Sequence, residues 1–141
     1  VFSYAYKNGV KTVLNPAPAN KPSDILLQNT SWFIPNEIEF EEIYGDIFNE
    51  NNLLLFAKNV DTNVVVTLGE KGCAYIENNS VKIIKADSVK AIDTTGAGDA
   101  FVGAFSFALA SKLDIEECLK LALKKATDSV TKKGTQSSYK N

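Results

Sequence analysis

The part of this chain with the clearest chemical signal is positions 93–101, which spell Asp-Thr-Thr-Gly-Ala-Gly-Asp-Ala-Phe. A glycine-rich turn at the start of a helix directs several backbone N–H groups into one concavity, and phosphate is the anion most often held there. Asp99 falls in the first turn of the expected helix. A carboxylate there would repel phosphate unless it accepts a hydroxyl proton during phosphoryl transfer. The pattern therefore predicts Asp99 as a general base and the amides of Gly96, Ala97 and Gly98 as an anion hole.

A purely structural explanation of the same residues stands beside the catalytic one. Asp99 could cap the helix, and the glycines could serve only to make a tight turn. Short glycine patterns recur by chance, so a bare Gly-x-Gly-Asp would favour this explanation. The full nonapeptide lies between an expected β-strand at 88–92 and an apolar helix at 100–110, and in that setting it favours phosphoryl transfer.

The composition narrows the chemistry that these residues can perform. The 141 residues carry 15 basic and 17 acidic side chains, for a net charge of −2, and every basic residue is a lysine. Because histidine is absent, a general base must be Asp or Glu. Because arginine is absent, a phosphate must be held by backbone amides, lysines and a metal ion. No basic stripe is present, which argues against nucleic acid or an anionic membrane as a partner.

The two cysteines and the lack of long apolar runs indicate in which cellular compartment the protein is expected. Cys73 and Cys118 lie far apart among apolar neighbours, so each is expected to be a buried, unpaired thiol. The sequence shows no disulfide framework, no run of membrane-spanning length and no signal-peptide pattern. We therefore expect a cytoplasmic protein.

The expected elements alternate between strands and helices, which predicts an α/β fold with a mostly parallel sheet. Strands are expected at 11–15, 32–34, 63–68, 73–77 and 81–84. The last two form a hairpin about Asn78-Asn79. Helices are expected at 1–8, 24–28, 37–44, 53–59, 100–110 and 114–131. The asparagine-rich stretch 49–52 is expected to be a surface loop.

The nonapeptide resembles the C-terminal signature of the ribokinase-type (PfkB) sugar kinases. Three further segments match that family in order, namely 14–19 (Leu-Asn-Pro-Ala-Pro-Ala), 35–39 (Pro-Asn-Glu-Ile-Glu) and 66–72 (Val-Thr-Leu-Gly-Glu-Lys-Gly). Segment 130–138 (Val-Thr-Lys-Lys-Gly-Thr-Gln-Ser-Ser) is similar to the tail of the ribokinases within the family. The resemblance implies a Rossmann-like three-layer α/β fold, with residues 1–141 as its C-terminal, nucleotide-binding half. The N-terminal sugar-binding half and the lid would lie outside this chain.

The resemblance also implies an activity, namely ATP-dependent phosphorylation of the primary (5-) hydroxyl of D-ribose by a protein that is a homodimer when complete. Two alternatives stay open. One is a kinase for fructose, a nucleoside or another carbohydrate alcohol, since only segments 14–19 and 130–138 favour ribose. The other is an inactive nucleotide-binding fragment whose sheet edge pairs with a partner.

Asn36 and Glu39 match an Asn-x-x-Glu motif of the family, which implies that they order Mg²⁺, phosphate and water. From the residues alone, an amide and a carboxylate at i and i+3 share one helix face and suit hydrated Mg²⁺, or else form a helix cap followed by a solvated acid. Thr67, Gly69 and Gly72 follow the most strand-like segment, where α/β proteins bind ligands. There the resemblance implies contacts with the nucleotide.

Ribokinases have in common a monovalent-cation site beside the anion hole, built mostly from backbone carbonyls. The resemblance implies a K⁺ site at Asp93, Thr95, Ser129, Lys132, Gly134 and Ser138. From the residues alone, Lys132 and Gly134 suggest instead a cationic helix C-terminus and its left-handed cap. Both interpretations can hold at once, because carbonyl groups rather than side chains would bind the cation.

Overall fold

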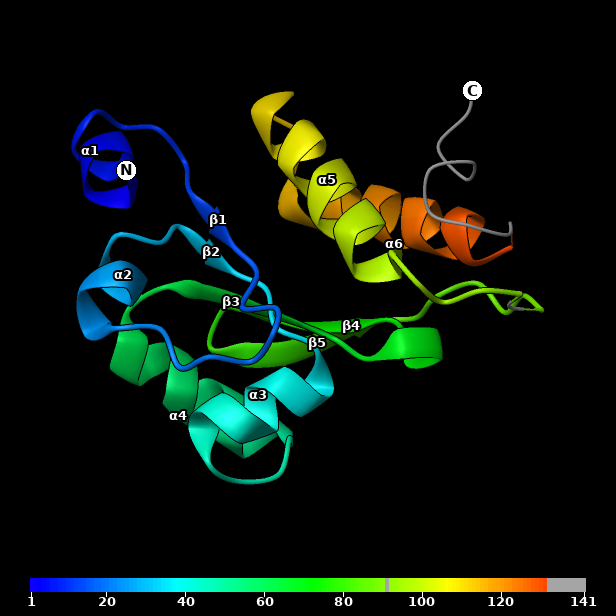
Figure 1. The fold of residues 1–141 in the computed structure, drawn as a ribbon, viewed down its shortest axis with the longest axis horizontal. Coiled ribbons are helices and arrows are strands. Elements are labelled where there is room, and N and C mark those ends of the chain that lie inside the picture. The colour runs from blue at the N-terminus through cyan, green and yellow to red at the C-terminus, as the bar shows by residue number, and fades with distance from the viewer. Residues whose placement is uncertain (91, 132–141) are drawn as a thin grey trace. The chain divides into compact units, whose positions relative to one another are not determined.

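The structure is a computed structural model that describes residues 1–90 and 92–131 (Figure 1). The chain divides into two compact units. The first unit comprises Val1–Leu68 and Ala74–Ile83, and the second comprises Gly69–Cys73 and the chain from Ile84 onward. No helix among the described residues is both long and apolar enough to cross a bilayer.

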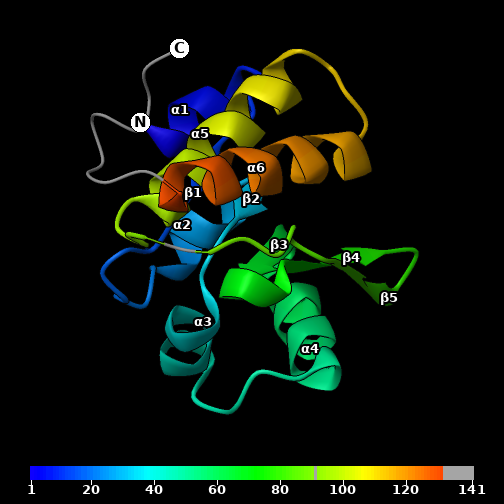
Figure 2. The same cartoon turned by 90° about the vertical axis from the view of Figure 1, so that its right-hand side faces the viewer.

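A five-stranded sheet in the order β1-β2-β3-β4-β5 organises the first unit (Figures 1 and 2). Its strands are β1 (Val13–Leu14), β2 (Trp32–Phe33), β3 (Asn63–Thr67), β4 (Cys73–Glu77) and β5 (Ser80–Ile84). The first three are parallel, and Phe33 is paired with Leu14 on one side and with Val64 on the other. Asn78 and Asn79 have φ angles of 51° and 58°, so they form the two-residue hairpin turn that the sequence predicts.

Helices connect the strands. The first unit contains α1 (Phe2–Lys7), α2 (Asp24–Gln28), α3 (Glu37–Tyr44) and α4 (Glu50–Val60). The second unit contains the 3-10 turn η1 (Gly69–Lys71), α5 (Ala97–Ala110) and α6 (Ile115–Val130). Within the part of the chain that the structure describes, four helices begin at a short polar residue whose side chain accepts a hydrogen bond from the first turn, namely Ser23, Asn36, Asn49 and Asp114. The expected starts of α2, α3 and α6 are confirmed because such caps act locally.

Two expectations about local structure are wrong. The stretch 49–52 is not a loop, because Asn49 caps α4 by accepting from the Asn52 N–H at 2.8 Å. The buried Asn52 amide donates to the Ile47 carbonyl at 2.9 Å, so tertiary contacts satisfy its polar group inside the helix. The expected strand at 88–92 is not formed by its described residues, 88–90 and 92, which are exposed. A β-branched pattern makes a strand only where a neighbouring strand supplies hydrogen-bond partners.

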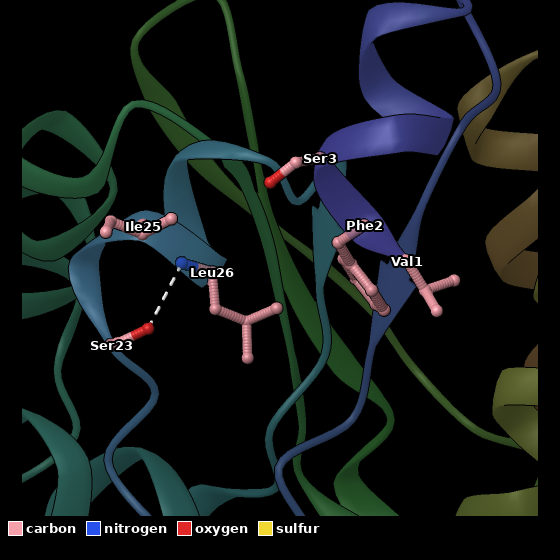
Figure 3. Close-up of a pocket in the computed structure, with 6 residues that line it drawn as sticks. All are labelled: Val1, Phe2, Ser3, Ser23, Ile25 and Leu26. Atoms are coloured by element: carbon pink, nitrogen blue, oxygen red, sulfur yellow. Dashed lines mark hydrogen bonds between the residues drawn. The ribbon is translucent and has the colours of Figure 1, made fainter.

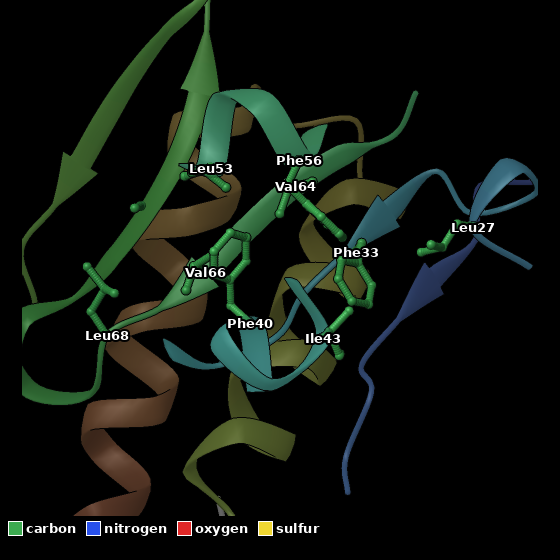
Figure 4. Close-up of a cluster of buried hydrophobic side chains, with 10 residues drawn as sticks. Leu27, Phe33, Phe40, Ile43, Leu53, Phe56, Val64, Val66 and Leu68 are labelled. Atoms are coloured by element: carbon green, nitrogen blue, oxygen red, sulfur yellow. The ribbon is translucent and has the colours of Figure 1, made fainter. Parts of the chain in front are cut away.

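The apolar core of the first unit lies between the sheet and helices α3 and α4 (Figure 4). It includes Phe33, Phe40, Ile43, Leu53, Phe56, Val64 and Val66. The ring of Phe40 meets the ring of Phe56 edge-on at a centroid distance of 5.4 Å. Burying one such side chain stabilises a fold by about 1.5–3 kcal/mol. This packing holds the first turn of α3 at the ends of the parallel strands.

Helices α5 and α6 pack against each other in the second unit. Helix α5 buries Ala100, Phe101, Phe105 and Ala108, and α6 buries Cys118, Leu119, Ala122, Leu123 and Ser129. Leu119 and Ala122, one turn apart on α6, are both fully buried. The pair thereby fixes the start of α5, where the glycine-rich turn lies.

Both cysteines are free and buried, as expected. Burial raises the pKa of the Cys73 thiol from 9.0 to about 12. Since the raised pKa favours the protonated thiol in the folded state, this contribution to stability is complete below about pH 9 and is lost as the pH rises toward about 12.

In a Cys118→Ala background, we expect Cys73 to resist a thiol-reactive disulfide reagent near neutral pH until denaturant is added. Rapid labelling of the folded protein would contradict this expectation.

Candidate functional site

One group of predicted residues lies where the parallel strands end, within the first unit. Asn36 follows β2, and Thr67 is the last residue of β3. The Thr67 N–H donates to the Pro35 carbonyl at 3.0 Å, and Thr67 pairs with Asn36 in an isolated parallel bridge. The two residues therefore lie side by side at the carboxyl ends of their strands, the edge at which α/β proteins bind ligands.

Asn36 and Glu39 form a reciprocal cap of α3. Asn36 Oδ1 accepts from the Glu39 N–H, and Glu39 Oε2 accepts from the Asn36 N–H, each at 2.8 Å. Glu39 is only 8% exposed, so it is not the solvated acid that the structural alternative supposed. The cap locks an amide and a carboxylate together at the positive end of a helix.

This pair fits a hydrated Mg²⁺ ion but not a closed metal cage. Among the described residues no group of three or more acidic or cysteine side chains could enclose a metal. Mg²⁺ keeps several waters and is commonly held by one or two carboxylates together with substrate phosphates. A single carboxylate such as Glu39, near the carboxyl ends of the parallel strands, agrees with that mode of binding.

The turn after β3 contains two glycines in left-handed conformations. The Gly72 N–H donates to the Gly69 carbonyl at 3.1 Å, which closes the turn. Gly69 has a φ of +59° with open space around its Cα, whereas Gly72 has a φ of +108° and lies against another part of the second unit. A Cβ at Gly72 would lie 1.9 Å from the Ile84 carbonyl oxygen. Gly72 is thus required by a close approach of two backbone segments, independently of any ligand.

The glycine-rich turn at the start of α5 differs from the starts of the capped helices. Gly96 is the N-cap, with a left-handed φ of 83°, and no side chain caps the helix. The Ala97 N–H donates to the Thr94 carbonyl at 3.3 Å, so this amide already takes part in the turn. The N–H groups of Gly98 and Asp99 have no acceptor within the helix, as in the first turn of any α-helix. They are the amides that an anion would meet.

Asp99 occupies the third position of α5 and is exposed. Because the cap position belongs to Gly96, the explanation that Asp99 serves as the helix cap is wrong. The carboxylate therefore lies exposed in the first turn of a helix that starts at a glycine and has no side-chain cap.

Three of the residues predicted for a monovalent cation are described, and the structure brings them to one region. Asp93 Oδ1 accepts from the Thr95 N–H at 2.9 Å. The Val130 carbonyl at the end of α6 accepts from the N–H groups of Ile92 and Asp93, at 2.8 and 3.2 Å. These bonds hold the loop before α5 against the end of α6, beside Ser129. The other three, Lys132, Gly134 and Ser138, lie outside the described residues.

The model of the pfkB carbohydrate kinases matches residues 1–141, which is the whole chain. The chain belongs to the pfkB family of carbohydrate kinases. Its α/β architecture is accordingly that of the ribokinase-type fold.

Individual members of the pfkB family are similar to this chain over nearly all of its length. The ribokinase of Haemophilus influenzae is 44% identical over 140 residues, which cover 95% of this chain and 45% of that protein. The deoxyribokinase of Salmonella typhi is 38% identical over 144 residues, covering 98% of this chain and 47% of that protein. The structure of Arabidopsis thaliana ribokinase complexed with ribose and ATP matches with a TM-score of 0.86 and 27% identity, covering 98% of this chain and 47% of that one. The chain spans about half the length of these pfkB relatives.

A pocket between α1 and α2 is a different kind of surface (Figure 3). It is lined by Val1, Phe2, Ser3, Ser23, Ile25 and Leu26. The lining has no charged side chain, and Ser23 Oγ already accepts from the Leu26 N–H at 3.3 Å. None of the residues predicted to bind phosphate or metal lines it. The pocket therefore lacks the groups that a phosphate or a metal ion requires.

Proposed function

We propose that the intact protein is an ATP-dependent kinase that phosphorylates the primary 5-hydroxyl of D-ribose. The observation that carries this proposal is the start of α5, where a left-handed Gly96 replaces a side-chain cap and the Asp99 carboxylate lies exposed in the first turn. The 44% identity to a ribokinase supports ribose as the acceptor. A cytoplasmic location and a homodimeric assembly belong to the same proposal.

In the proposed reaction, Asp99 acts as the general base. As the sugar hydroxyl oxygen bonds to the γ-phosphorus of ATP, its proton passes to the Asp99 carboxylate, and the bond from that phosphorus to the ADP oxygen breaks. The N–H groups of Gly98 and Asp99 donate to the oxygens of the transferring phosphoryl group, at the positive end of α5. The proposed anion hole thus keeps Gly98 from the predicted one and adds Asp99. Gly96, with its left-handed φ, and Ala97, whose N–H donates to Thr94, instead shape the turn that presents these amides.

The strand-end residues are assigned to the nucleotide and its metal. Glu39, held by its cap with Asn36, would bind Mg²⁺ through water or through one carboxylate oxygen. When bound, Mg²⁺ would neutralise charge on the ATP phosphates. Thr67, Gly69 and Gly72 are assigned to contacts with the nucleotide, which are expected at the carboxyl ends of parallel strands.

The loop from Asp93 to Thr95 is assigned to a monovalent cation, together with Ser129 and with Lys132, Gly134 and Ser138. The support is the set of hydrogen bonds that ties this loop to the Val130 carbonyl. A K⁺ ion bound to carbonyl groups here would order the loop that leads directly into the amides of Gly98 and Asp99.

A second acceptor, 2-deoxy-D-ribose, is favoured by the 38% identity to a deoxyribokinase over 98% of this chain. The two sugars share the 5-hydroxyl and differ only at the 2-position. The chemistry assigned to Asp99 is the same for both, so the present residues do not discriminate between them.

Turnover by the intact natural protein tests the proposed reaction. ADP release from Mg²⁺-ATP would be measured with ribose, 2-deoxyribose, fructose and adenosine, each in K⁺ and in a matched concentration of a large organic cation. We expect the highest kcat/KM with ribose and a clear stimulation by K⁺. Preference for 2-deoxyribose would favour the second candidate, and ATP binding without turnover on any alcohol would contradict the kinase assignment.

Two glycines in α5 allow a matched test of the amides. A Cβ at Gly98 or at Gly103 would meet nothing within 4 Å, so both alanine variants should fold. Each should stabilise the helix by about 0.5–1 kcal/mol, because glycine is a poor helix former. We expect only Gly98→Ala to lower kcat, by about a hundredfold, because a methyl group there displaces the phosphoryl group from the amides. Equal kcat values for the two variants would remove Gly98 from the site.

A further inference from the structure

The parallel ladder between β1 and β2 stops at a proline. The N–H groups of Trp32 and Ile34 donate to the carbonyls of Thr12 and Leu14, at 2.9 and 2.8 Å. In a parallel ladder the bonds continue at every second residue, so the next donor to the Ile34 carbonyl would be the N–H of residue 16. Residue 16 is proline, which has no N–H.

The side chain of Asn15 takes the place of this missing donor. Asn15 Nδ2 donates to the Ile34 carbonyl at 2.8 Å, which adds one hydrogen bond beyond the end of β1. Ile34 is 1% exposed, so without Asn15 its carbonyl would lie in a region poorly reached by water. The side-chain amide of Asn15 thus donates the hydrogen bond that Pro16, lacking an N–H, cannot donate.

The bond supports the backbone directly before the Asn36–Glu39 cap. On the β1 side, Asn15 holds the Ile34 carbonyl, and on the β3 side, the Thr67 N–H holds the Pro35 carbonyl at 3.0 Å. The next residue is Asn36, the N-cap of α3. The chain that enters the cap is therefore tied to both neighbouring strands.

We propose that Asn15 is a positioning residue for the strand-end site: its side-chain amide replaces the Pro16 N–H and holds Asn36 and Glu39 in place. The consequence for Mg²⁺-ATP rests on the proposed function, whereas the hydrogen-bond role does not. Asn15 is partly buried, and its amide acts through the Ile34 backbone rather than through contact with a ligand.

The proposed role of Asn15 can be tested by a second substitution that should restore the lost hydrogen bond, because Pro16→Ala supplies the backbone N–H that proline lacks. Four forms of the intact natural protein would be compared: wild type, Asn15→Ala, Pro16→Ala and the double variant. Hydrogen exchange of the amides of Asn36 and Glu39 reports on the cap without requiring activity. We expect Asn15→Ala to accelerate this exchange and to raise the KM for Mg²⁺-ATP about tenfold, with a smaller change in kcat.

The double variant should recover most of the slow exchange and of the low KM, while Pro16→Ala alone should change both little. If the double variant behaves like Asn15→Ala, the side chain does not act through the Ile34 carbonyl, and the proposal is overturned. If Asn15→Ala does not fold, recovery of folding in the double variant supports the proposal and continued misfolding contradicts it. Rescue of exchange in a protein that shows no kinase turnover would uphold the role of Asn15 while refuting the proposed function.

Discussion

Replacing Asp99 by asparagine should lower kcat by about a hundredfold to ten-thousandfold, the range over which a general base contributes to catalysis. Asparagine has nearly the same shape as aspartate but cannot accept the hydroxyl proton. Because Gly96 rather than Asp99 occupies the cap position of α5, the substitution should leave the helix in place. The lost interaction with the helix dipole would cost about 0.3–1 kcal/mol of stability. Single-turnover phosphoryl transfer and the urea midpoint of the same protein would be measured together.

Asp114 supplies the opposite control. It caps α6 by accepting from the Glu117 N–H at 2.9 Å, and no catalytic role is assigned to it. Asp114→Ala should destabilise the protein by about 1 kcal/mol while leaving kcat unchanged. If Asp99→Asn instead lost stability and kept its turnover, Asp99 would be a structural residue and the phosphoryl-transfer interpretation of the nonapeptide would be wrong.

Replacing Gly72 by alanine should produce the largest loss of stability among these variants, about 2–5 kcal/mol. The added Cβ would lie 1.9 Å from the Ile84 carbonyl oxygen and 2.8 Å from the Ala86 nitrogen. Both atoms belong to the backbone, so neither can rotate away as a side chain could. The φ of +108° is also unfavourable for alanine. Equilibrium unfolding in urea measures the loss.

Gly69 is the matched comparison for Gly72. It lies three residues earlier in the same turn, and its φ of +59° carries only the left-handed cost, because a Cβ there would meet nothing within 4 Å. We expect Gly69→Ala to lose about 1–2 kcal/mol. Equal losses for the two variants would show that the segment at Ile84–Ala86 yields easily and that the close approach does not constrain this turn.

Much of the fold could be predicted because its signals are local. Ser23, Asn36 and Asp114 are short polar residues that accept from amides of the following helical turn, so each marks a helix start from sequence alone. Asn78-Asn79 marks its hairpin in the same way. The local signals misled where burial decided the outcome. Asn52 lies inside α4 because the Ile47 carbonyl accepts its amide, and nothing in an asparagine-rich stretch indicates that contact.

In the candidate site, too, local features could be predicted from the sequence whereas tertiary contacts could not. The residue types at 93–101 predicted a glycine-led helix start with an acid in its first turn, and α5 begins in that way. Their catalytic and binding roles stay predictions. The sequence did not indicate that the Ala97 N–H donates to the Thr94 carbonyl, nor that Glu39 is buried in a reciprocal cap with Asn36.

The sequence by itself determined the family and the order of the elements, and it limited the residue types available for chemistry. With neither histidine nor arginine, it predicts an acid as the base and backbone amides, lysines and a metal ion as the phosphate ligands. The tertiary structure decided which residues have which neighbours. It placed Thr67 beside Asn36 and brought the Ile84 carbonyl so close to Gly72 that a Cβ would not fit there. It also placed the Asn15 side chain where it donates to the Ile34 carbonyl in place of the missing Pro16 N–H. Each of these contacts joins residues 12 or more positions apart, and such contacts depend on how strands and turns pack rather than on the residues that adjoin them in the chain.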